Sequence, residues 1–383
     1  MSMATGRGGR PIVANIARLR ALMERDGVDA CVLRGGQNVT WLAGIPYHGT
    51  LARHLDLAAS PRGVVAIWPR EGDPALVVDA TAAGASERTG WIERIEVYDG
   101  YQERLFGRVA KVLADMRLAQ QRRRLALDRN FIGAGFWEEL SGLLPGIDLI
   151  DGTALLDEAR FIKTAAEVDM FRAGARLLDT VLAAAFPTIR AGEREREVHG
   201  RIIGGCLAQG AEFAHGIFNS HRNPVIYCGE SAFVLERGDI IRTDYLAYLD
   251  CYPGHQSRNA VLGPPAPAQQ RDYALYYDIY RRAAEQLRPG RTAGEIYDFV
   301  AAAFARIGWT YRAGLVGHSV GPWWHQQEPI LCRGNRTPLE PGMVIALEPF
   351  VDHWHCQDLF LITEGEAELL SGDFDTSAMF VIA

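Results

Sequence analysis

The segment between Asp244 and His255 constrains the fold of this chain more than any other. Residues 239–248 have the pattern of a strand, which carries Asp244. His255 follows eleven positions after Asp244 and leads into a second predicted strand at 257–262. Side chains alternate between the two faces of a strand, so a bend between the strands can bring both residues onto one face. The sequence therefore predicts a hairpin with a polar pair, and Pro253-Gly254 is the expected bend.

Three later segments carry residues of the same chemical kind. His318 lies in the run GHSVG, and His325 follows it seven positions later. Glu348 ends a predicted strand at 343–348, and Gln357 precedes another at 359–363. Imidazole and carboxylate groups gathered by strands can hold a metal ion or transfer protons. These positions are the candidate site.

The elements predicted elsewhere form two modules, and the expected fold class is α+β with mixed α/β content. Apolar periodicity assigns the first module to residues 1–157 and the second to 158–383. Thr164 and Glu167 form a capping box that opens a long helix. The predicted helices lie at 13–26, 103–118, 164–186, 194–209, 268–286 and 292–307, and the further predicted strands at 29–34, 63–67, 75–78 and 124–128.

Composition excludes some classes of function. The net charge of −7 argues against a nucleic-acid surface, which needs a basic stripe. The six cysteines are scattered without CxxC spacing, which indicates reduced thiols and no disulfide framework. No apolar signal-peptide core follows the basic amino terminus, and no apolar run is long enough to span a bilayer. We expect a cytoplasmic protein that acts on a small molecule.

The motifs GHSVG, LEPGMV and ALEP, with the spacing from Asp244 to Gln357, resemble the superfamily of methionine aminopeptidase, prolidase, aminopeptidase P and creatinase. The resemblance covers nearly the whole chain. It implies a creatinase-like amino-terminal domain, a pita-bread catalytic domain of curved antiparallel sheet flanked by helices, and a homodimer. The five metal ligands of the family fall on Asp244, His255, His318, Glu348 and Gln357.

Two of these five positions depart from the family pattern. His255 stands where the metallopeptidases have Asp, and Gln357 where they have Glu. Two divalent ions about 4 Å apart repel by roughly 17 kcal/mol at an effective dielectric constant near 20. Only Asp244 and Glu348 remain to offset that repulsion with negative charge. We therefore predict at most one divalent ion, zinc, manganese or iron, and no dinuclear centre.

Two interpretations of the site stay open. In the first, His255, His318 and Glu348 bind one ion, with Asp244 or Gln357 completing its shell. In the second, no metal is bound, and His255 or His325 transfers protons as in creatinase, with Glu348 holding a cationic substrate.

Substrate contacts are expected from residues around these ligands. Arg258 can clamp a carboxylate, or form a structural salt bridge instead. Trp324, together with Trp323, can form an apolar wall of the site against a small substrate. Tyr227 lies at the position where the family has a further histidine. His215 and His221 are candidates to replace that histidine, although a loop position is the simpler interpretation. The final two candidates, His353 and His355, are interpreted as rim residues that can also serve as ligands.

The functional prediction is a creatinase-like hydrolase of a C–N bond in a small polar metabolite, such as an amide, amidine or amino-acid derivative, with His325, His255 and Glu348 as catalytic residues. The first alternative is a metal-dependent Xaa-Pro peptidase, which the missing acidic ligands oppose. The second is a non-catalytic binding protein that retains the pocket.

Overall fold

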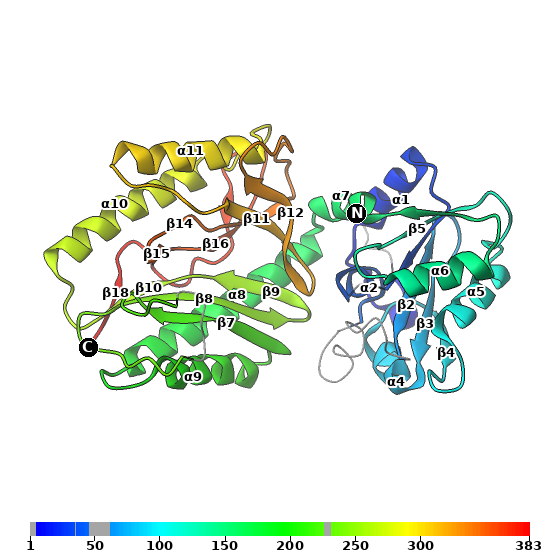
Figure 1. Cartoon of the computed structure of the whole chain (residues 1–383), viewed down its shortest axis with the longest axis horizontal. Helices are drawn as coiled ribbons and strands as arrows, with labels where there is room; N and C mark the ends of the chain where they lie inside the picture. Colours follow the sequence, from blue (N-terminus) through cyan, green and yellow to red (C-terminus); the bar gives the residue numbers. More distant parts are fainter. Residues whose placement is uncertain (1–4, 35, 46–61, 226–230) are drawn as a thin grey trace. The chain divides into compact units, whose positions relative to one another are not determined.

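The computed structural model describes residues 5–34, 36–45, 62–225 and 231–383. The chain divides into two compact units, Met1–Arg160 and Phe161–Ala383 (Figure 1). The sequence analysis placed the boundary between residues 157 and 158, within helix α7 (Thr153–Phe161). Within the described ranges, every helix is too short or too polar to cross a membrane.

The first unit is built on a six-stranded mixed sheet in the order β4-β3-β2-β1-β5-β6. The strands predicted at 63–67 and 75–78 correspond to β2 and β3, which pair antiparallel as a hairpin. The strands are β1 (Ala30–Leu33), β2 (Val64–Pro69), β3 (Ala75–Asp79), β4 (Arg94–Tyr98), β5 (Arg124–Leu127) and β6 (Asp148–Asp151). Besides α7, its helices are α1 (Ile16–Arg25), α2 (Gly36–Ala43), α4 (Ala80–Thr89), α5 (Leu105–Asp115) and α6 (Ala134–Leu143), with a 3-10 turn η1 (Arg7–Gly9).

The second unit holds two larger sheets, in the orders β18-β10-β8-β7, with β9 paired to β8, and β12-β11-β13-β16-β17. A third pair, β14 and β15, forms a short hairpin. The strands are β7 (Phe213–Ser220), β8 (Ile240–Leu249), β9 (Tyr252–Gln256), β10 (Asn259–Leu262), β11 (Leu315–Gly321), β12 (Trp324–Cys332), β13 (Val344–Leu347), β14 (Phe350–Val351), β15 (Trp354–His355), β16 (Asp358–Leu361), β17 (Glu368–Leu369) and β18 (Phe380–Ile382).

Helices cover the outer faces of these two sheets (Figure 1). Helices α8 (Ala165–Ala185) and α9 (Glu195–Ala208) pack against the β7–β10 sheet, with a 3-10 turn η2 (Phe186–Thr188) after α8. Helices α10 (Pro267–Ala284) and α11 (Ala293–Arg306) pack against the other sheet. Apolar side chains fill both helix–sheet layers, so the polar residues of the strands are left to face the space between the sheets.

Helix α8 begins as predicted, because the Thr164 hydroxyl accepts from the Glu167 amide and the Glu167 carboxylate accepts from the Thr164 amide. The helix then comes unusually close to β9. A Cβ atom on Gly254 would lie 2.2 Å from the carbonyl oxygen of Gly174, so only glycine permits this backbone contact. The contact fixes the position of the strand that carries His255.

The bend between β8 and β9 differs from the prediction. The chain reverses at Asp250 and Cys251, whose φ angles are 50° and 69°, and Pro253-Gly254 lies inside β9. Strand β9 pairs only with β8 among the described strands. An edge strand tolerates proline because one row of its backbone groups needs no partner strand.

The cysteine prediction holds for the five cysteines in the described ranges. All five are free thiols, and Cys31, Cys206, Cys251 and Cys356 are buried.

Candidate metal centre

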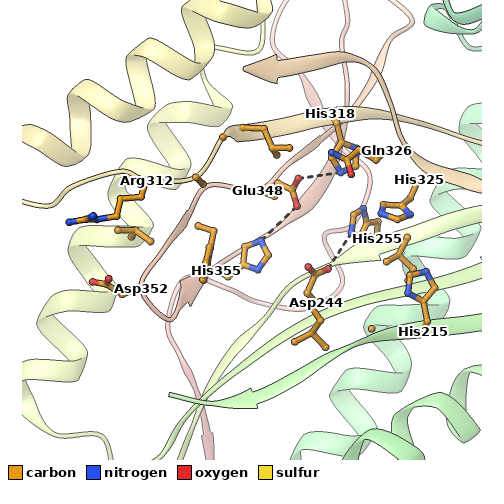
Figure 2. A pocket seen from close by; sticks show the side chains of 18 of the residues that line it. His215, Asp244, His255, Arg312, His318, His325, Gln326, Glu348, Asp352 and His355 are labelled. Atoms are coloured by element: carbon orange, nitrogen blue, oxygen red, sulfur yellow. Dashed lines mark hydrogen bonds and ion pairs between the residues drawn. The ribbon is translucent and has the colours of Figure 1, made fainter. Parts of the chain in front are cut away.

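A cavity of about 820 Å³ opens in the second unit between the two sheets. Asp244, His255, His318, His325 and Glu348 all line it, so the structure brings together four of the five predicted ligands and the additional histidine (Figure 2). A cavity of this volume suits a small organic ligand.

Strand geometry places Asp244 beside His255. Leu246 pairs with His255 in the β8–β9 hairpin, which makes Asp244 the diagonal neighbour of His255 on the same face. The Nε2 atom of His255 lies 3.2 Å from Oδ1 of Asp244. Burial opposes the charge on Asp244, but the contact with His255 holds the pKa of this carboxyl well below its usual range. The polar pair predicted from the sequence is confirmed.

The second sheet places His318 beside Glu348 in the same way. His318 pairs with Ala346 of β13, and Glu348, two residues further, donates its backbone amide to Val316. The Nδ1 atom of His318 lies 2.9 Å from the Ser319 carbonyl, an arrangement in which Nδ1–H donates and Nε2 faces Oε1 of Glu348 at 3.2 Å. Burial lowers the pKa of His318, but the Glu348 carboxylate outweighs that effect and raises it.

Gln357 contacts His255 but does not line the cavity. Its side-chain nitrogen lies 2.9 Å from Nδ1 and 3.0 Å from Nε2 of His255, and the Ser257 hydroxyl donates to its oxygen at 2.9 Å. A neutral amide held in this way adds no charge to the centre. Gln357 therefore orients His255 here, where the family has an acidic ligand.

His355 lies deeper than the sequence analysis expected. It was interpreted as a rim residue, but its exposed fraction is 4% and it lines the cavity. The β14–β15 hairpin turns at Asp352 (φ 53°) and pairs His355 with Phe350. The His355 amide then donates to Oδ1 of Asn259 at 2.8 Å. These contacts carry the ring into the site, where Figure 2 shows Glu348 between His318 and His355.

Two overlapping sets of ligand atoms result. The donor atoms of His255, His318 and Glu348 lie within 4.8 Å of one another, and so do those of Asp244, Glu348 and His355. Imidazole nitrogens and carboxylate oxygens at such separations fit a divalent ion. The residues present therefore fit a metal cofactor.

His325 and His215 extend the imidazole cluster along the cavity. The ring centroid of His325 lies 5.0 Å from that of His255 and 5.8 Å from that of His215. Burial and the neighbouring His255 lower the pKa of His325 to about 2, so its ring is neutral at ordinary pH. His215 belongs to strand β7 and lines the cavity, whereas a loop position had been expected. His221 follows β7, and its Nδ1 accepts from the Ile240 amide at 3.0 Å.

Arg258 does not line the cavity, and its assignment to a substrate carboxylate is corrected. Its side chain is fully buried, and its Nη2 lies 2.7 Å from Asp179 and 2.9 Å from Asp358. Its Nη1 donates to the carbonyls of Ser257 and Gln357. Arg258 therefore forms the structural salt bridge that the sequence analysis gave as its second interpretation. The second predicted substrate residue, Tyr227, and the side chain of the third, Trp324, lie outside the described part of the chain.

Two family models match the chain. Residues 169–364 match the metallopeptidase family M24, and residues 15–162 match the creatinase/prolidase N-terminal domain. The Xaa-Pro dipeptidase of Pyrococcus furiosus is 30% identical over 57% of this chain, and the match spans 65% of that relative. A probable dipeptidase of Mycobacterium tuberculosis is 27% identical over 92% of this chain and 89% of its own length.

Solved structures show the same fold. The prolidase from Pyrococcus horikoshii OT3 superposes with a TM-score of 0.78 at 22% identity, covering 94% of this chain and 99% of its own. The X-Pro aminopeptidase from Thermotoga maritima gives a TM-score of 0.80 at 17% identity, covering 96% of this chain and 99% of its own. The predicted fold class, with a creatinase-like domain followed by a pita-bread domain, is confirmed.

Proposed function

The chain belongs to the metallopeptidase family M24 and is a hydrolase acting on C–N bonds, and from this premise we propose that it cleaves the amide bond of short peptides of the Xaa-Pro dipeptide class. The observation that carries the proposal is the set of His255, His318 and Glu348 at the wall of the 820 Å³ cavity. This donor set and this volume together support metal-assisted hydrolysis of a small substrate.

The relatives change the order of the functional predictions. The sequence analysis preferred creatinase-like hydrolysis of a polar metabolite and kept the Xaa-Pro peptidase as an alternative. Because the relatives bear the names Xaa-Pro dipeptidase and dipeptidase, they support that alternative over the preferred interpretation. Membership in a hydrolase family also removes the reason for proposing a non-catalytic binding protein.

A divalent metal is the cofactor that the family implies. Bound at His255, His318 and Glu348, such an ion would polarise the scissile carbonyl and lower the pKa of water near it. The proposal keeps one tightly held ion of zinc, manganese or iron, because Asp244 and Glu348 are the two carboxylates in the overlapping ligand sets of the described residues.

The side chains around the ligands have separate roles in the proposal. Asp244 and Glu348 border the reacting volume and can accept the proton that the attacking water loses. His325 stays neutral and hydrogen-bonds to the amide group of the substrate while its carbon becomes tetrahedral. Arg312 is exposed at the cavity mouth and can pair with the carboxylate of a dipeptide. The proton held by the carboxylate finally passes to the leaving nitrogen.

The expected homodimer and the cytoplasmic location are also kept as parts of the proposal. Sedimentation of the purified chain tests the first of these.

Hydrolysis assays test the proposed function. The purified protein, loaded in parallel with zinc, manganese or iron, is incubated with Xaa-Pro dipeptides, and the release of proline is measured. The same preparation is incubated with guanidino and amide metabolites. Proline release that stops after treatment with a chelator supports the proposal. Turnover of a guanidino compound without any dipeptide hydrolysis would favour the creatinase-like interpretation instead.

A further inference from the structure

A second, smaller cavity in the same unit is lined by the end of β7, by β8 and by the β14–β15 turn. Its volume is about 230 Å³, and every described residue that lines it has a polar or charged side chain. Pockets that enclose a whole small molecule measure about 300–1,000 Å³ and are mostly apolar. A polar space of the smaller size therefore suits one charged functional group or a small ion.

Arg242 brings a guanidinium to this cavity. It precedes Asp244 by two positions on β8, so both side chains leave the same face of the sheet. Arg242 is buried, its Nη2 donates to Oδ1 of Asn219 at 3.3 Å, and its guanidinium carbon lies 4.7 Å from the centre of the Phe350 ring. A guanidinium is a planar fork of N–H donors, the geometry that binds carboxylate and phosphate oxygens.

Two histidines add hydrogen-bond donors to the same space. Nδ1 of His221 accepts from the Ile240 amide at 3.0 Å, so its neutral ring carries the proton on Nε2. The ring of His353 lies 5.6 Å from that of His221, measured between centroids. The Nε2 atom of His353 is buried, and among the described residues it has no hydrogen-bond partner. A buried polar atom of this kind needs a partner, which a ligand in the cavity can provide.

Acidic residues also border this cavity, but they are exposed or held by other donors. Asp352 lines it and is exposed, so solvent and salt screen its repulsion of an anion. Asp239 pairs with Arg222, and Glu195 accepts from the Ser220 amide at 2.7 Å. The described lining therefore favours a negatively charged ligand.

We propose that the second cavity is an oxyanion site, in which Arg242, His221 and His353 donate hydrogen bonds to a carboxylate or phosphate group. The inference goes beyond the proposed function, because it assigns a ligand to a space outside the candidate metal centre. Two sources can supply the oxygens. One is a free phosphate ion, and the other is an acidic side chain of a peptide in the larger cavity, since Asp352 lines both cavities.

The first test is titration calorimetry of the full chain with sodium phosphate, before and after treatment with a chelator. Phosphate in the second cavity should bind in both states, whereas phosphate on a metal ion should be lost with the metal. Arg242→Gln should weaken the chelator-resistant binding at least about tenfold, the effect of losing a hydrogen bond to a charged group. Arg312→Gln is the matched control, an exposed arginine of the larger cavity, and it should leave the phosphate affinity unchanged.

Two further variants decide the question if Arg242→Gln fails to fold. His353→Leu removes a nitrogen that has no described partner, so it should keep the wild-type melting temperature and weaken phosphate binding about two- to tenfold. Asp352→Asn removes an exposed negative charge, so it should strengthen phosphate binding by up to about fivefold.

Peptide pairs identify the source of the oxyanion. The kcat/KM of Glu-Pro is compared with that of Gln-Pro, and the kcat/KM of Ala-Pro-Glu with that of Ala-Pro-Gln. A preference of about tenfold for an acidic peptide, lost in Arg242→Gln, assigns the site to a substrate side chain. Equal values together with phosphate binding assign it to a free ion.

The proposal is overturned if wild type shows neither chelator-resistant phosphate binding nor an acidic preference, or if Arg242→Gln and His353→Leu leave both unchanged. The outcomes also separate this inference from the proposed function. Chelator-resistant phosphate binding without peptide hydrolysis would keep the oxyanion site and reject the peptidase. Peptide hydrolysis with neither phosphate binding nor an acidic preference would do the reverse.

Discussion

Removing the charge of Arg258 should destabilise the catalytic unit and leave substrate affinity nearly unchanged. The guanidinium is fully buried between the carboxylates of Asp179 and Asp358, whose exposed fractions are 1% and 4%. Burial raises the pKa of Asp179, and Arg258 counteracts that effect. Replacement with methionine preserves much of the side-chain volume but leaves two buried carboxylates without their cation.

The size of the effect follows from this geometry. Breaking a buried ion pair by removing one partner costs about 3–5 kcal/mol, because the remaining charge stays buried. In a unit of this length each kcal/mol lowers the melting temperature by about 2–4 °C. Arg258→Met should therefore lower the melting temperature by about 6–20 °C. Arg258→Lys should fall between wild type and Arg258→Met, since lysine keeps the charge but not the planar set of donors.

The assay combines thermal unfolding, followed by circular dichroism, with KM measurements on an Xaa-Pro dipeptide. The double variant Arg258→Met with Asp179→Asn should recover part of the lost stability, because one of the two unpaired charges is removed as well. Arg312→Ala is the matched control, an arginine that lines the cavity and is exposed. A melting temperature for Arg258→Met within about 2 °C of wild type, combined with a raised KM, would refute the structural assignment and restore Arg258 as a substrate ligand.

Three further predictions address the site and its scaffold. Glu348→Gln should lower kcat by about 10²–10⁴-fold, because it removes a metal ligand and a proton acceptor together; unchanged turnover of an Xaa-Pro dipeptide would argue against both roles. Arg312→Ala should raise KM about tenfold for a dipeptide but not for its carboxamide, and an equal rise for both would exclude a contact with the carboxylate. Gly254→Ala should lower stability by about 1–3 kcal/mol, since its Cβ would meet the Gly174 carbonyl; Gly200→Ala, with open space around its Cβ, is the control in the same denaturation experiment.

The core of the site was predictable because local rules and long-range geometry agree there. Asp244 and Glu348 lie on strands, or directly after them, with clear periodicity, and the two-residue repeat of a strand fixes which face each side chain occupies. This alternation predicted the pair of Asp244 and His255, and the resemblance of the motifs to the family added His318 and Glu348 to the same ligand set. The structure places both pairs within 3.2 Å, as measured between Nε2 and a carboxylate oxygen.

His355 was named as a possible ligand, but its burial was not predicted because its strand is too short to produce a pattern. Strands β14 and β15 have two residues each, so no alternation can be recognised. Their turn at Asp352 has no glycine or Asn-Gly pair to mark it. The available signal was the sequence Phe-Val-Asp-His-Trp-His itself, in which two polar residues separate the pair Phe350-Val351 from the pair Trp354-His355.

The role of Arg258 could not be settled from local sequence for a different reason. Its two partners, Asp179 on α8 and Asp358 on β16, are distant in the chain. Whether an arginine is exposed or enclosed by carboxylates depends on tertiary packing, which local propensity does not contain. The bend was misplaced similarly: proline and glycine usually mark turns, but the edge position of β9 accommodates both.

The glycine contact between α8 and β9 positions the backbone of β9 next to residue 255 without using the side chain of that residue. Backbone atoms make the closest contact between α8 and β9, and the side chains of Tyr252 and Gln256 add hydrogen bonds to Glu167 and to the Ala175 carbonyl. None of these contacts uses the side chain of residue 255, so a change from imidazole to carboxylate at that position leaves them in place. The exchange His255→Asp with Gln357→Glu should accordingly fold and bind a second ion more tightly, making this chain a platform for switching metal preference by design.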